Sequence, residues 1–150
     1  MTTVSDPERA EAIRDRYREV FATVPQGIED RIAVAGATGR LEAVETIEQF
    51  RLVLLAGNTL GPRTQQLVHF AQLVALGRGG PARLHARGAI RAGAEPADLV
   101  GVAETSLVTS GMPAYALAIE IIDKEAMPRG AAPAGAGRAP DAAASSGEER

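Results

Sequence analysis

Apolar residues recur at three- and four-residue steps along most of this chain, and charged residues fill the positions between them. That spacing places the apolar side chains on one face of an α-helix. Ser5 and Glu8 stand three residues apart, which is the pattern of a capping box at a helix start. After this start the recurring residues are Ala10, Ile13, Tyr17, Val20, Phe21 and Val24. The pattern therefore predicts an amphipathic helix that begins near Ser5 and ends before Pro25.

The same reasoning predicts six further helices, which glycine and proline residues separate. We expect them over residues 27–35, 41–55, 62–76, 81–93, 95–108 and 113–122. The stretch from Leu52 to Leu55 is apolar on all sides, so we expect it to be buried. No segment has the alternation typical of a strand, and the connections are short. An all-α helical bundle of about seven helices follows.

The composition changes after Ala126 to alanine, glycine, proline and serine. Such a segment buries too little apolar surface to offset the entropy lost on ordering. We therefore predict one helical domain over residues 1–126 and a disordered tail over 127–150. The tail either keeps the protein in solution or docks to a partner.

The sequence has no cysteine among its 150 residues, which excludes thiol redox chemistry and thiolate metal ligands. Its net charge is -3, with arginine and glutamate interspersed, so no basic face is available for a nucleic acid. The N-terminus carries acidic residues and no apolar signal core, and no apolar run reaches the roughly 18 residues that cross a bilayer. We expect a soluble, cytoplasmic protein that binds neither nucleic acid nor membrane.

Three stretches in the second half of the chain carry a resemblance to a known family. They are LGPRTQQLVHFAQLVALG from Leu60, RLHARGAIRAGAEPADLV from Arg83 and TSGMPAYALAI from Thr109. Together they resemble the carboxymuconolactone decarboxylase and alkylhydroperoxidase family, in which a helix carries a reactive histidine, here His85. The resemblance implies an all-α fold of the alkylhydroperoxidase type, a homo-oligomer of three or six chains, and a small-molecule substrate handled without a cofactor.

The chain departs from the family pattern at positions that matter for chemistry. Peroxidatic members resemble E…C-x-x-C-x-x-x-H, and these four slots hold Gln66, Arg78, Pro81 and His85. A second acidic slot of the family is Gly101 here. An amide does not exchange a proton near neutral pH, so the carboxylate-to-histidine relay does not carry over. Thiol peroxidase activity is excluded by the absence of cysteine.

His85 is the candidate catalytic acid/base. It falls in the second turn of a helix that begins at Gly80 and Pro81, where the partially positive helix end disfavours the charged imidazolium. A neutral imidazole is suited to general acid/base work. The alternative is a histidine that only bonds a backbone carbonyl inside the bundle.

Gln66 and His69 are candidate substrate-binding residues, because they stand three residues apart and share one face of the preceding helix. That helix is expected to pack beside the one that carries His85. Two histidines without a carboxylate make a poor metal site, since catalytic zinc usually has three protein ligands. We predict no bound metal.

Two charged residues complete the candidate site. Glu104 interrupts an apolar helix and is a candidate catalytic carboxylate, with a raised pKa if it is buried; the alternative is an ion pair across a subunit interface. Arg78 is a candidate anchor for a substrate carboxylate, and the alternative is an exposed charge at a helix end.

The leading hypothesis is a cofactor-free lyase or isomerase that transfers a proton on a small carboxylated, lactone-like substrate. Decarboxylation, isomerisation and cyclisation all remain open, as does the identity of the substrate. The alternative is a non-catalytic, oligomeric binding protein of the same fold. The surroundings of His85 distinguish the two, because a cavity beside it favours an enzyme and a filled core favours a scaffold.

Overall fold

The computed structural model describes residues 5–127, and within this range the regular structure is entirely helical. The helices are α1 (Asp6–Phe21), α2 (Gln26–Ala37), α3 (Leu41–Ala56), α4 (Pro62–Ala75), α5 (Gly79–Arg91), α6 (Pro96–Ser110) and α7 (Met112–Glu125). The prediction of an all-α protein with about seven helices is confirmed. Apart from Met127, the predicted tail lies outside the described residues.

The helix boundaries follow local sequence signals. At the start of α1 the Ser5 N–H donates to the Glu8 carboxylate at 2.8 Å, as the predicted capping box requires. Proline occupies the first turn of α4 and of α6, where its missing N–H costs nothing. Helix α5 begins two residues earlier than predicted, because Gly79 and Gly80 join its first turn.

The last four helices surround one apolar core. Its largest fully buried side chains are Phe70 and Val74 of α4, Leu99 of α6 and Ile121 of α7. Helix α5 contributes alanines with no exposed surface, Ala82, Ala86 and Ala89, and these small side chains allow it to lie close against α4. This core fixes the relative position of α4 and α5, the two helices that carry the candidate histidines.

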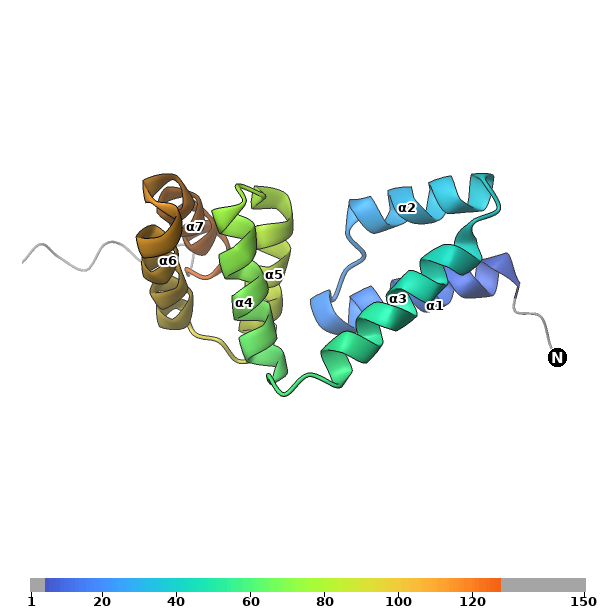
Figure 1. The fold of residues 1–150 in the computed structure, drawn as a ribbon, viewed down its shortest axis with the longest axis horizontal. Helices are drawn as coiled ribbons and strands as arrows, with labels where there is room; N and C mark the ends of the chain where they lie inside the picture. The colour runs from blue at the N-terminus through green and yellow to red at the C-terminus, as the bar shows by residue number, and fades with distance from the viewer. Residues whose placement is uncertain (1–4, 128–150) are drawn as a thin grey trace, which may run out of the picture.

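The first three helices form a second group beside it (Figure 1). Their buried side chains make a separate cluster, which includes Ile13, Tyr17 and Phe21 of α1. Leu84 of α5 packs against this cluster, and α1 contacts α5 directly. The connection over residues 57–61 links α3 to α4 at the junction of the two groups.

Gln65 of α4 holds this connection in place. Its side-chain amide donates to the Leu55 carbonyl at the end of α3 and to the Leu60 carbonyl, both at 2.8 Å. The Leu60 N–H in turn donates to the Asn58 side chain at 2.8 Å. These bonds pair backbone groups that the end of α3 would otherwise leave open.

The expected burial of Leu52 to Leu55 is wrong for the single chain. Leu52, Val53 and Leu54 are 46%, 60% and 54% exposed. Helix α3 packs against α1 and α2 with one face only, through Leu41, Val44 and Glu48, and no described helix covers the opposite face. Because apolar residues surround the end of α3, some of them must point outward.

None of the helices described between residues 5 and 127 has the length and apolar character that crossing a membrane requires.

Candidate active site

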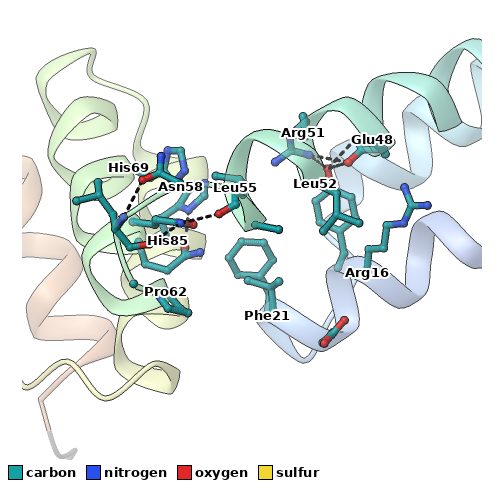
Figure 2. Close-up of a pocket in the computed structure, with 18 of the residues that line it drawn as sticks. Arg16, Phe21, Glu48, Arg51, Leu52, Leu55, Asn58, Pro62, His69 and His85 are labelled. Carbon is teal, nitrogen blue, oxygen red and sulfur yellow. Dashed lines mark hydrogen bonds and ion pairs between the residues drawn. The ribbon is translucent and has the colours of Figure 1, made fainter.

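A cavity of about 550 Å³ lies at the junction of the two helix groups (Figure 2). Its walls come from α1 and α3 on one side and from α4, α5 and the connecting residues 58–61 on the other. The volume is in the range of ordinary small-molecule sites. Gln66, His69 and His85 all line it, so the structure brings together three of the five site residues predicted from the sequence.

His85 is held by a hydrogen bond to Gln66. The two residues belong to neighbouring helices, α5 and α4, and His85 Nδ1 lies 2.7 Å from Gln66 Oε1. An amide oxygen only accepts, so Nδ1 carries the proton and donates it to this bond. The other ring nitrogen, Nε2, then keeps its lone pair and is the basic atom of the ring. Gln66 is buried, which restricts the motion of this pair.

Two further rings enclose His85. The His69 ring is tilted by 39° to it at a centroid distance of 4.7 Å, and Phe21 of α1 meets it edge to face at 5.4 Å. His69 stands one helical turn after Gln66, as the predicted shared face requires. Phe21 was not anticipated from the sequence, because its contact with His85 joins residues of α1 and α5 that are far apart in the chain.

Both imidazoles are neutral near pH 7. The pKa of His85 is lowered from 6.5 to about 4, first by burial and then by the nearby His69 and the Arg51 charge. Burial and Arg51 also lower the pKa of His69. Burial, the largest of these causes, disfavours the charged imidazolium because it removes the ring from water.

The opposite wall contains a buried carboxylate that sequence reasoning missed. Glu48 of α3 is 4% exposed and accepts hydrogen bonds from the Tyr17 hydroxyl at 3.0 Å, from Arg31 at 2.9 Å and from Arg51 at 2.8 Å. Arg51 also donates to the Tyr17 hydroxyl. Burial, the leading cause, raises the pKa of Tyr17, so its phenol stays protonated and can donate.

The sequence did contain a signal for this cluster. Leu41, Val44 and Glu48 follow each other at three- and four-residue steps, so Glu48 occupies a position of the buried stripe of α3. A carboxylate at such a position requires a partner. The identity of the partners depended on the packing of α1 and α2 and was not readable from spacing.

Arg78 and Glu104 do not reach this cavity. Arg78 is exposed at the cap of α5 and Glu104 is exposed on α6, and neither lines the cavity. The expected burial of Glu104 is therefore absent in the single chain. The arginines that do line the cavity are Arg16 and Arg51.

Gly88 is a further residue that the site requires. A Cβ atom at this position would lie 2.7 Å from Gln66 Oε1 and 3.0 Å from a ring carbon of Phe21. Any larger residue would push against the amide that orients His85. Glycine is thus needed here for close approach of α4, α1 and α5.

No cluster of three or more histidine, cysteine, aspartate or glutamate side chains suited to a metal ion occurs between residues 5 and 127. His69 and His85 offer two nitrogen ligands without a carboxylate close by, whereas catalytic zinc usually has three protein ligands.

These features define a helical protein with a small-molecule cavity and a neutral histidine oriented by an amide. The chain belongs to the carboxymuconolactone decarboxylase family, whose model matches residues 42–124. The matched region runs from α3 to α7 and includes Gln66, His69 and His85, whereas the wall contributed by α1 precedes it. A search of curated proteins and a search of solved structures gave no match.

Proposed function

We propose that this protein is a cofactor-free lyase or isomerase that moves a proton on a small carboxylated, lactone-like substrate. The observation that carries the proposal is the bond between His85 and Gln66, which fixes the proton on Nδ1 and leaves Nε2 basic in a ring that lines the cavity. A positioned imidazole of this kind is a typical general acid/base.

The proton balance is simple. Nε2 accepts a proton from the substrate, and the imidazolium returns it to a different substrate atom within the same turnover. Gln66 stabilises the ring orientation but exchanges no proton, so Nε2 carries the transferred proton, which can exchange with solvent before it is returned. An isomerisation uses this step unchanged. In decarboxylation the C–C bond to the carboxylate breaks and carbon dioxide leaves, and in cyclisation the carboxylate adds to a double bond; in both, His85 takes a proton from water and delivers it to the carbanion carbon.

A pKa of about 4 in the empty site makes His85 a weak base. The negative charge of a bound substrate would make it a stronger one. A carboxylate near the ring favours the imidazolium and raises its pKa towards neutrality. The site would therefore become basic when an anionic substrate is bound. His69, whose pKa is also lowered, remains a neutral hydrogen-bonding group beside it.

The test uses a panel of carboxylated lactones incubated with the protein in D₂O and followed by NMR. Loss of carbon dioxide reports decarboxylation, double-bond migration reports isomerisation, and opening of the lactone ring reports the reverse of cyclisation; deuterium incorporation marks the carbon that receives the proton. We expect His85→Gln to lower the rate by about 10²- to 10⁴-fold, the usual contribution of a positioned acid/base. Arg91→Gln, an exposed change on the same helix, is the matched control and should leave the rate unchanged.

The second candidate is a non-catalytic binding protein, and Gln66 favours it, because an amide stands where the family pattern has a carboxylate. If the protein is a non-catalytic binding protein, no lactone of the panel is turned over, and His85→Gln has a lower Tm than wild type. Full activity in a destabilised His85→Gln protein would end the catalytic proposal. For either function we propose a cytoplasmic homo-oligomer.

A further inference from the structure

We propose that the cavity binds an amphipathic monocarboxylic acid, with its carboxylate on Arg51 and its apolar body along the walls formed by α1, α3 and the connecting residues. This ligand class rests on the proposed function, which requires a carboxylated substrate. Arg51 would bind the carboxylate in place of Arg78, which does not reach the cavity. The substrate class is thereby narrowed from any small carboxylated compound to one with an extended apolar part.

Arg51 is held in place for this role by its neighbours. Its Nη1 donates to Glu48 Oε2 at 2.8 Å and to the Tyr17 hydroxyl, and its guanidinium carbon lies 5.6 Å from the centre of the Tyr17 ring. Among residues 5–127 the hydrogen bonds of Arg51 all use Nη1. Its Nε and Nη2 therefore keep three N–H donors, and this edge of a guanidinium matches the two oxygens of a carboxylate.

The charge at this wall also favours an anion. Glu48 accepts from both Arg31 and Arg51, so two guanidinium groups share one carboxylate and one positive charge is left over. The charge of Arg51 lowers the pKa of His69 and of His85, which places its field inside the cavity. A carboxylate on Arg51 would offset that field.

Arg16 adds a second guanidinium to the same wall. One of its nitrogens, Nη2, donates to Gln49 at 3.2 Å, while Nη1 is buried and has no hydrogen-bond partner within the described part of the chain. A buried donor without a partner is costly, and a ligand oxygen would relieve that cost. Glu19, the other carboxylate at the cavity, is exposed, where solvent and salt screen its charge.

The remaining walls of the cavity are apolar but exposed to solvent. Val20 of α1, Leu52 of α3 and Leu60 of the connection all line the cavity, yet they are 42%, 46% and 41% exposed. An apolar ligand body would remove this surface from water, which favours binding. A compact dicarboxylate would leave these side chains exposed and would place a second charge against them. The walls therefore favour a ligand that has one carboxylate and one apolar chain.

The first experiment compares three probes on the wild-type protein by isothermal titration calorimetry: octanoate, octanamide and succinate. Octanamide has the chain without the charge, and succinate has charge without the chain. We expect octanoate to bind at least about 10-fold more tightly than either, because it gains the charge-assisted bonds and the apolar contact. Equal affinity for octanoate and octanamide, or tighter binding of succinate, would overturn the inference.

The second experiment uses paired variants. Arg51→Met should weaken octanoate binding by about 10- to 100-fold and leave octanamide unaffected, whereas Arg40→Met, an exposed change at the start of the same helix, should change neither. Leu52→Asn should weaken octanoate and octanamide alike, while Val53→Asn, exposed and outside the cavity, is its control. Circular dichroism verifies that each variant is folded. If Arg51→Met fails to fold, the three-probe comparison and the Leu52→Asn and Val53→Asn pair still test the proposed ligand class.

His85→Gln separates this inference from the proposed function. The variant should still bind octanoate with an affinity close to wild type, because the carboxylate and chain contacts involve other residues. Normal octanoate binding together with unimpaired turnover would refute the acid/base role and leave the ligand class standing. Loss of turnover in His85→Gln, together with failure of wild type to prefer octanoate, would refute the ligand class and leave the acid/base role.

Discussion

Acidification should destabilise the fold through His85, and the size of the effect follows from its surroundings. The folded-state pKa is about 4, below the ordinary value of 6.5, because the ring is buried beside His69 and faces the Arg51 charge. As the pH falls, the unfolded chain therefore takes up this proton before the folded chain does. The stabilising contribution is complete above pH ~6.5 and is lost progressively between ~6.5 and ~4.

The difference between 6.5 and about 4 corresponds to at most about 3 kcal/mol, because each pKa unit is worth somewhat more than ~1 kcal/mol. The imidazole retains some contact with solvent, which screens the charge of the protonated form. We therefore expect about 1–2 kcal/mol of unfolding free energy to be lost through this residue across the window.

Urea unfolding, followed by circular dichroism at several values between about pH 7.5 and pH 4, measures the effect. Carboxylates also titrate in this range, so the informative quantity is the difference between wild type and His85→Gln. That difference should shrink as the pH falls, because glutamine takes up no proton. Parallel curves of unfolding free energy against pH for the two proteins would show that His85 has the same pKa in the folded and unfolded chain. Burial would then not lower the pKa of His85.

Three other predictions concern the packing of the site, the exposed surface and the tail. Gly88→Ala should lower stability by about 1–3 kcal/mol and disturb the NMR signal of the His85 Nδ1 proton, because its Cβ would meet Gln66 Oε1 at 2.7 Å. Gly101→Ala, with nothing within 4 Å of the added atom, is the control and should not destabilise the fold. Light scattering should show a homo-oligomer, since Phe50 of α3 is 61% exposed and Val108 of α6 is 86% exposed; a stable monomer would contradict this. Truncation after Met127 should leave Tm nearly unchanged, and a large fall would show that residues 128–150 pack on the helices.

Much of the local structure could be predicted because its causes are local. Ser5 with Glu8 determines the start of α1, and proline in the first turn marks the starts of α4 and α6. The three-residue spacing of Gln66 and His69 places both on one face of α4 by geometry alone. The family resemblance pointed to His85 for a similar reason, since the stretch RLHARGAIRAGAEPADLV that carries it is contiguous in the chain.

The rest of the site was decided by packing between distant segments. Tyr17 and Glu48 are 31 residues apart, and Phe21 meets His85 only because α1 lies against α5. Arg78 is the N-cap residue of α5 and Arg51 lies within α3, and nothing in their spacing tells which one faces the cavity. Periodicity gives the face of a helix that is apolar, but not the neighbour that covers it. The sequence by itself therefore determined the helices and made His85 a candidate, while only the tertiary structure decided which charges surround that histidine and which apolar residues of α3 remain exposed.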